Sequence, residues 1–399
     1  MISDPFTYLG DLLREVLVGL GLTTGQAAAL IQFLGAGALA TAVLLLTFLL
    51  IWAERKILAR IQDRLGPNRV GPYGLLQTIA DAAKLLTKEV IVPDGADKLL
   101  YYLAPPLTVM SVVGLWAVIP LAPNLIGSDI NVAVIYLISI GAIGTLGIML
   151  AGWSSNNKYA LLGAFRSVAM LISYEVPMVL ALLVPTMLAG SMGMVAIVES
   201  QRSMWFVVLA PLAALLFFTS SMAEAGKAPF DLLEAESEIV AGYNIEYSSM
   251  AFGMFFVGEF LHGFTLAALT VTLFFGGWLG PGVHTYTWLG LIYLLLKTAV
   301  VYFVVVWVRG TLPRLRIDQV NAFNWKFLVP LALVVVVVTA VADKLATSVG
   351  WGRTPAMLVA NGLVFLGTLV VMQRYGRAQR LKYEGRAAMA PEPAGAPRP

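Results

Sequence analysis

The sequence contains no cysteine, and this absence excludes several kinds of redox chemistry. The chain cannot form a disulfide, ligate an iron–sulfur cluster through cysteine or hold zinc through thiolates. Its only histidines, His262 and His284, are too few and too far apart in sequence to indicate a haem or zinc centre. We therefore expect no metal site and no covalently bound cofactor. Any electrons must arrive on a partner or a diffusible carrier.

Charged residues are also scarce. They make up 12% of the 399 residues, whereas 59% are hydrophobic. A typical soluble domain carries about 25% charged residues. A chain with so little charge cannot cover itself with polar surface, so lipid must be its solvent. The composition predicts an all-α integral membrane protein surrounded by membrane lipids, with no nucleic-acid partner.

Long apolar stretches then define the spans, since about 20 apolar residues are needed to cross the hydrocarbon core. We predict nine transmembrane helices, at 28–52, 100–122, 131–152, 167–190, 204–224, 249–278, 286–308, 326–343 and 355–373. Residues 5–20 predict an interfacial helix. The expected organisation is an interfacial segment at 1–27, a membrane core of about eight spans at 28–343, an additional span at 344–375, and a disordered cytoplasmic tail at 376–399.

The distribution of basic residues orients these spans. With the N-terminus outside, the loops 53–99, 153–166, 225–248 and 309–325 and the tail become cytoplasmic. With Lys326 counted at the boundary of its loop, that side then holds all but five of the 26 Lys and Arg residues, the five being Arg14, Arg202, Lys297, Lys344 and Arg353. Because cytoplasmic loops of membrane proteins are rich in Lys and Arg, we predict a multi-pass membrane protein with its N-terminus outside and its C-terminus in the cytoplasm.

Residues 75–90 have two chemically different faces. Gln77, Asp81, Lys84 and Lys88 fall on one side of a helix, and apolar residues fall on the other. This pattern is typical of an amphipathic helix that lies in the membrane interface. Such a helix acts either as an anchor or as the rim of a portal through which a lipid-soluble substrate enters from the bilayer.

Acidic residues gather between residues 223 and 247, on the side that is otherwise basic. They are Glu224, Asp231, Glu234, Glu236, Glu238 and Glu246. Glu234 and Glu238 are one helical turn apart, so their charges repel, and repulsion and burial both favour the protonated carboxyl group. Such a cluster can hold protons for a proton path. The alternative is a solvated acidic loop, against which stand interspersed apolar residues such as Phe230 and Ile239.

Three ionisable residues, Glu175, Glu259 and Lys297, fall inside predicted spans. At about 1.5 Å per residue, each lies roughly 13–17 Å from an end of its span, near the midplane. Ionisable side chains are costly in lipid and are therefore candidates for function. Two acids and a base at one depth indicate a buried polar axis or, alternatively, a structural ion pair between helices. Pro177 leaves the Ser173 carbonyl without its helical partner, which adds an acceptor or a water site.

Another group of charges lies in the loop 309–325, with Arg309, Arg314, Arg316 and Asp318. Arginine at a membrane interface either enforces topology or binds a ligand.

With these residues in view, the chain resembles the H subunits of the NADH-quinone oxidoreductases, the respiratory complex I family. The matching stretches are ERK at 54–56, GPNRVGPYGLLQTIADAAKLLTKE at 66–89, SSNNKYALLGAFRSVAMLISYEVPM at 154–178, APFDLLEAESEIVAGYNIEYSSM at 228–250 and VRGTLPRLRIDQ at 308–319. They cover about residues 40–330 and lie mostly in loops, where hydropathy alone would not force similarity.

The resemblance implies a protein at the heel of the membrane arm, without a redox centre of its own, that contacts other membrane-arm subunits and the iron–sulfur-containing hydrophilic arm. Its substrate would be a quinone. Carried over by position, the quinone chamber would include Arg55, Asp81, Asp231, Arg314 and Arg316. The proton channel would include Glu175, Glu224, Glu234, Glu236, Glu238 and Glu259, with Lys297 added as the base of the buried axis.

Three features depart from the family pattern. Lys227 stands where arginine is usual, which reduces a two-pronged contact to a point charge. Leu233 stands where proline is common. The family core has eight spans, so residues 355–373 and the tail are extensions.

Two other functions remain open from the sequence. The first is that of the equivalent membrane component of a membrane-bound hydrogenase, which uses no quinone. The second is a stand-alone secondary transporter, although no pair of similar halves with broken helices is found. The proteins that co-purify with the chain distinguish these functions.

The charge asymmetry predicts the topology. Residues beyond Met372 should face the cytoplasm and residues before Leu20 the opposite side. A reporter that works only in the cytoplasm should therefore be active when fused near Arg386. Activity there of a reporter that works only outside the membrane would contradict the nine-span arrangement.

Overall fold

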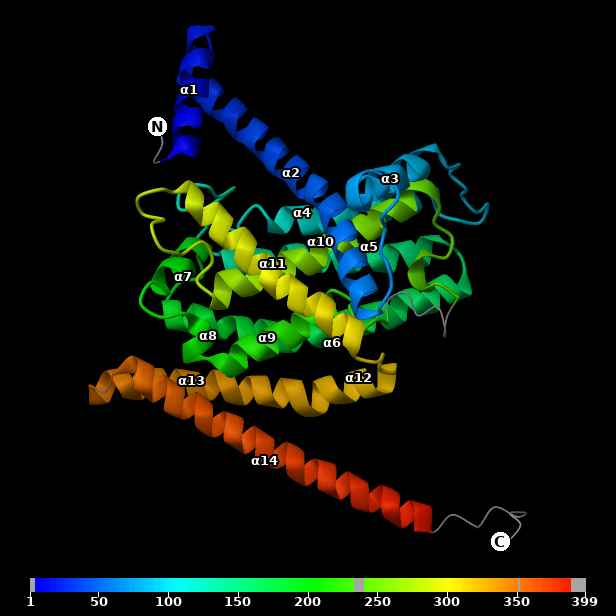
Figure 1. Ribbon diagram of the computed structural model, residues 1–399, viewed down its shortest axis with the longest axis vertical. Helices are drawn as coiled ribbons and strands as arrows, with labels where there is room; N and C mark the ends of the chain where they lie inside the picture. The colour runs from blue at the N-terminus through cyan, green and yellow to red at the C-terminus, as the bar shows by residue number, and fades with distance from the viewer. Residues whose placement is uncertain (1–3, 233–239, 351, 389–399) are drawn as a thin grey trace.

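The computed structural model describes residues 4–232, 240–350 and 352–388 (Figure 1). Within these ranges the chain forms helices and no β-strand. Eight helices in the described part are long and apolar enough to cross a membrane. The all-α membrane class is thus confirmed.

Seven of these helices are α2 (Thr24–Ile61), α4 (Lys98–Leu115), α5 (Ala133–Ser154), α6 (Lys158–Ala189), α10 (Ser249–Phe274), α11 (Trp288–Thr311) and α14 (Arg353–Ala388). The eighth runs from α12 (Ile317–Phe323) through a π-helical turn, η3 (Asn324–Leu328), into α13 (Val329–Val349). The shorter elements are α1 (Pro5–Gly19), η1 (Pro72–Gly74), α3 (Gln77–Thr87), α7 (Met194–Ser200), α8 (Phe206–Leu209), α9 (Pro211–Glu224) and η2 (Gly242–Asn244).

The predicted span 204–224 is a broken element. It consists of α8 and α9, which are separated at Ala210 because a new helix begins with Pro211. Proline is well suited to the first position of a helix, where its missing N–H costs nothing. The main part of this predicted span is therefore a helix of 14 residues, shorter than the eight long helices.

Several helices extend further than hydropathy predicted. Helix α2 continues from the predicted end at 52 to Ile61, and α6 begins at Lys158 instead of 167. Helix α14 continues to Ala388, so the first part of the predicted disordered tail is helical. Hydropathy ends a span at the first charges, whereas a helix continues through charges that find partners or solvent.

Helix α10 lies at the centre of the bundle (Figure 1). It packs against α2, α4, α9 and α11, and most of its residues beyond Phe264 are buried. A helix that is apolar all round and buried is a core element. Side chains that α10 carries are consequently held on several sides.

Hydrogen bonds join three of the predicted cytoplasmic loops to one another at one end of the bundle. The Leu315 N–H donates to the Pro229 carbonyl at 3.0 Å, and Asn157 donates to the Glu246 carboxylate at 2.6 Å. At the other end, the Asn124 amide donates a hydrogen bond to the Asp4 carboxylate at 2.5 Å. The predicted division of loops between two sides therefore agrees with the contacts.

Two elements extend away from the bundle (Figure 1). Helix α1 and the first half of α2 form one arm, and α14 diverges from α13 toward the C-terminus. Near its start α14 is held by polar contacts: Arg353 donates to the Leu188 carbonyl at 2.8 Å, and buried Asn361 donates to the Leu209 carbonyl at 2.9 Å. The C-terminal extension is thus attached to the core at α6 and at the α8–α9 break.

Candidate functional site

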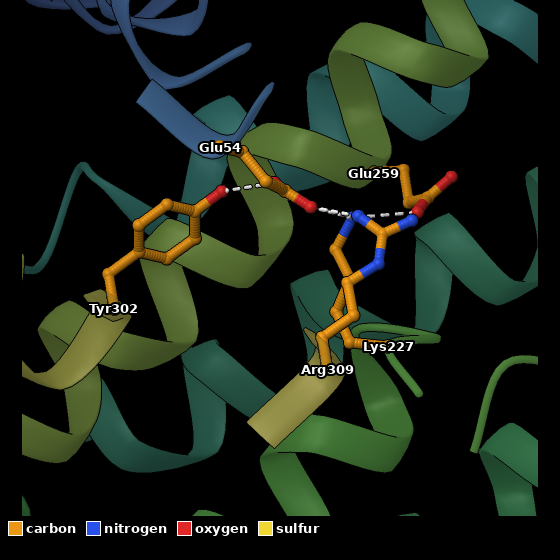
Figure 2. Close-up of polar contacts among 5 residues, drawn as sticks. All are labelled: Glu54, Lys227, Glu259, Tyr302 and Arg309. Atoms are coloured by element: carbon orange, nitrogen blue, oxygen red, sulfur yellow. Dashed lines mark hydrogen bonds and ion pairs between the residues drawn. The ribbon is translucent and has the colours of Figure 1, made fainter. Parts of the chain in front are cut away.

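A cluster of buried charges lies where α2, α10, α11 and the turn after α9 meet (Figure 2). Lys227 Nζ is 2.8 Å from Glu259 Oε1 and 3.8 Å from Glu54 Oε1. Arg309 contacts the same Glu54 oxygen, and the Tyr302 hydroxyl donates to Glu54 Oε2 at 2.7 Å. Four segments distant in sequence thus supply one network.

The turn after α9 directs Lys227 into the bundle. Gly226 has a φ of +62°, a conformation that glycine adopts without strain. The Lys227 N–H then bonds the Met222 carbonyl at 3.1 Å, and the Lys227 ammonium lies 4.4 Å from the centre of the Phe260 ring. The ammonium is therefore held by two carboxylates and an aromatic face.

The cluster is balanced in charge, and its two central members are buried. Glu54 and Lys227 are each 1% exposed. Two carboxylates, Glu54 and Glu259, face two cations, Lys227 and Arg309. Burying an ion is expensive unless it is paired and hydrogen-bonded. Each member consequently depends on the others for its charged state.

Two small cavities continue from the cluster into the bundle. The first, about 70 Å³, is lined by Glu259, His262 and Glu224 together with polar side chains that include Thr108 and Ser111. The second, about 40 Å³, is lined by Glu175, Glu224 and His262 among apolar side chains. A single water needs about 10–15 Å³ of such space. Both cavities can therefore hold water between acids.

These cavities bring together three of the predicted proton-path acids. Glu259 lies on α10, Glu224 ends α9 and Glu175 lies on α6. Glu224 lines both cavities, and its Oε2 has no hydrogen-bond partner among the described residues. The remaining predicted acids, Glu234, Glu236 and Glu238, lie outside the described residues.

Lys297 does not join these acids, and the expectation that it shares their depth is wrong. Its ammonium donates to the carbonyls of Phe275, Gly277 and Leu279 at 2.9, 3.1 and 2.8 Å. Phe275 follows the last residue of α10, roughly 24 Å along the helix from Glu259 at about 1.5 Å per residue. Lys297 thus caps the C-terminal end of α10, where a cation is favoured.

The Ser173 carbonyl, which Pro177 leaves without its helical partner, accepts a hydrogen bond from a side chain instead. Ser173 O accepts a hydrogen bond of 2.5 Å from Asn324 Nδ2, at the π-helical turn η3. The free position in α6 is therefore satisfied by a side chain from the segment that leads into α13.

The predicted quinone-site residues form two groups at the loop-rich end. Arg55 on α2 pairs with Asp81 on α3 at 2.6 Å, and both are partly exposed. Arg314 and Arg316 flank Leu315, whose N–H donates a hydrogen bond to the Pro229 carbonyl. Pro229 precedes Asp231 by two residues in the sequence. Half-buried Arg314 has an Nε and an Nη2 without a hydrogen-bond partner in the described ranges, whereas exposed Arg316 pairs with Asp318 at 3.0 Å.

The sequence did not predict Glu54, Tyr302 or His262 as site residues. It drew attention to Lys227 and Arg309 but did not place them in one buried cluster. Glu54 was taken for a loop residue because the span was ended too early. His262 follows Glu259 by three positions, a same-face helical spacing that could have identified it. No sequence signal distinguishes Tyr302 from the other aromatic residues of its span.

The chain is similar to known proteins over most of its length. The family model for NADH dehydrogenase matches residues 35–340. The H subunit of NADH-quinone oxidoreductase from Dehalococcoides mccartyi strain CBDB1 is 44% identical over 333 residues, which cover 84% of this chain and 92% of the relative. One H subunit from Geobacter metallireducens is 49% identical over 306 residues, covering 74% and 92%. The H subunit from Rhodospirillum centenum is 45% identical over 305 residues, covering 76% and 91%.

The buried cluster predicts strong coupling between Glu54 and Arg309. Glu54→Gln leaves the buried Lys227 and the partly exposed Arg309 facing one carboxylate, and it should destabilise the chain by about 3 kcal/mol. Glu54→Gln combined with Arg309→Gln removes one charge of each sign. The double variant should therefore be less destabilised than the sum of the single variants, by about 1–3 kcal/mol. Unfolding of the purified protein in mixed micelles measures both quantities.

The partly exposed Arg55–Asp81 pair provides the control. Asp81→Asn should cost at most about 1 kcal/mol, because exposed ion pairs contribute little. Additive effects of Glu54→Gln and Arg309→Gln would show that the cluster is not a coupled unit.

Proposed function

The chain belongs to the NADH dehydrogenase family, the H subunits of NADH-quinone oxidoreductase in respiratory complex I, and from this premise we propose that it forms part of a quinone chamber and of a proton path that begins beside it. The observation that carries the proposal is a series of ionisable groups inside the bundle. It runs from the buried Glu54 and Lys227 to Glu259, and then along two small cavities to Glu224 and Glu175.

The chamber side uses the groups at the loop-rich end. Arg55, Asp81, Asp231, Arg314 and Arg316 supply charged hydrogen-bonding partners for a quinone head group. Helix α3 presents exposed apolar side chains, with Ile79 55% and Leu86 67% exposed. An apolar surface of this kind fits an interfacial helix. A lipid-soluble substrate can therefore approach the charged groups from the bilayer along α3.

Electrons reach the chamber from outside this chain. The sequence has no cysteine, so an iron–sulfur relay must belong to a partner protein. The partners are thus the hydrophilic arm, which supplies electrons, and membrane-arm neighbours, which receive protons. The expected location is a bacterial inner membrane, with the loop-rich end facing the cytoplasm.

Coupling between the two processes is electrostatic. Arg309 is partly exposed and contacts Glu54, which is fully buried. A charge that forms in the chamber attracts or repels Arg309 and so changes the balance around Glu54 and Lys227. A buried carboxylate that loses a cationic neighbour is stabilised by taking up a proton. The proton then passes through water in the cavities to Glu224 and Glu175. The proposed path also includes the acids Glu234, Glu236 and Glu238 of the sequence prediction, whereas Lys297 caps α10.

The names of the relatives favour a quinone enzyme over a membrane-bound hydrogenase, since each of those cited is a subunit of an NADH-quinone oxidoreductase. Mass spectrometry of the native membrane complex tests this choice. Proteins that bind NADH and iron–sulfur clusters support the proposal, and a nickel–iron hydrogenase partner would overturn it.

A quinone chamber predicts specific labelling and one sensitive arginine. A photoreactive quinone analogue should label residues 55–90 or the vicinity of Asp231. Arg314→Ala should lower quinone reductase activity by about tenfold, because a hydrogen bond to a charged group contributes about 1.5–3 kcal/mol. The control is Arg202→Ala, which removes an exposed arginine at the other end of the bundle. Labelling confined to other subunits, together with a fully active Arg314→Ala variant, would count against the chamber.

The proton path predicts that Glu175→Gln and Glu259→Gln each reduce pumping and turnover together, by about tenfold or more. Glutamine keeps the volume and hydrogen bonding but cannot titrate, and blocking protons slows electrons in a tightly coupled enzyme. Assembly should persist, because a neutral amide costs less to bury than a lone charge. Reconstituted vesicles give the proton-to-electron ratio and the rate.

Glu199→Gln is the matched control, since Glu199 is an exposed acid outside the path. Wild-type ratio and rate in both path variants would make the buried acids structural.

A further inference from the structure

His262 is an ionisable residue that the glutamate path leaves without a role. It lies on α10 three positions after Glu259, so the two side chains share one face of the helix. The two cavities share three lining residues, Gly141, Glu224 and His262. Glycine contributes no side chain. Glu224 and His262 are therefore the titratable groups of the wall between the cavities.

The imidazole is available to water. Among the described residues, no backbone or side-chain group forms a hydrogen bond with it, although it is partly exposed to the cavities that it lines. A histidine with a purely structural role is usually fixed by such bonds. The second cavity offers few other polar partners, namely Glu175 and Glu224. Water there must consequently use the acids and His262.

We infer that His262 transfers protons between the water of the first cavity and that of the second, alongside Glu224. This inference rests on the proposed proton path and adds a residue of different chemistry to it. A neutral imidazole accepts a proton at its free ring nitrogen and releases the proton bound to the other nitrogen. The ring returns to its neutral form, and one proton has crossed the wall between the cavities.

Charges around the ring suit a transient cation. The acids that line the cavities are Glu259 on the same helix, Glu224 from α9 and Glu175 from α6. They stabilise an imidazolium when they are ionised. Lys227 opposes it, because the position next to His262, Gly263, lies against the Lys227 side chain.

The test compares variants of the whole complex in vesicles. His262→Gln removes titration and keeps a polar side chain, so it should lower turnover and pumping together by about tenfold. His262→Glu restores a titrating group and should recover most of the loss. His284→Gln, in an exposed turn, is the control and should match the wild type. A role in packing alone predicts the opposite order, because a buried carboxylate costs more than an amide.

The outcomes separate this inference from the proposed function. If Glu259→Gln impairs pumping but His262→Gln pumps like the wild type, His262 transfers no proton and the inference fails alone. If neither variant is impaired, the proton path itself fails. His262→Asn serves as a second, smaller amide. Failure of both amide variants to assemble would assign His262 a packing role and would also overturn the inference.

Discussion

Pairing of charge in a bundle dissolved in lipid is the constraint on which the rest of this structure depends. Helices in a bilayer gain little by hiding apolar surface from lipid, so packing and polar contacts determine how they meet. Lys227 must reach Glu54 and Glu259 together, and Arg309 must reach Glu54. These contacts determine where α2 and α11 cross α10. The position of Glu259 at the mouth of the first cavity follows from that crossing.

Backbone groups freed at helix breaks obey the same constraint. The Ser173 carbonyl, freed by Pro177, is satisfied by Asn324, and the carbonyls beyond α10 are satisfied by Lys297. The Leu209 carbonyl, at the α8–α9 break, is satisfied by Asn361. Without water, each such group would cost several kcal/mol unless protein supplied a partner. Each helix break is therefore joined by a hydrogen bond to a helix distant in sequence, and these hydrogen bonds help to fix the arrangement of the helices around the cavities.

Helix type, approximate spans and the amphipathic helix α3 could be predicted because they depend on local composition. Glu175 and Glu259 could be predicted because ionisable residues inside spans are rare, whereas Glu224 was joined to them only by the family resemblance. The ion-pair partners of the charged residues could not be predicted. Glu54 and Arg55 are neighbours in sequence, yet one is buried against Lys227 and the other pairs with Asp81 near the surface. Only the crossing of α2 over α10 distinguishes them, and that crossing depends on contacts made more than 150 residues away.

This difference between neighbouring residues matters for energy coupling. Two unit charges about 4 Å apart interact by about 1 kcal/mol in water and by about 4 kcal/mol at an effective dielectric constant near 20. A charge formed in the chamber is therefore screened around Arg55 and Asp81 but felt strongly by the buried cluster. The Arg309 side chain is 25% exposed and the Glu54 side chain is buried, so their contact spans the boundary between the two regimes. The proton response should consequently arise in the cluster, from which the cavities lead inward.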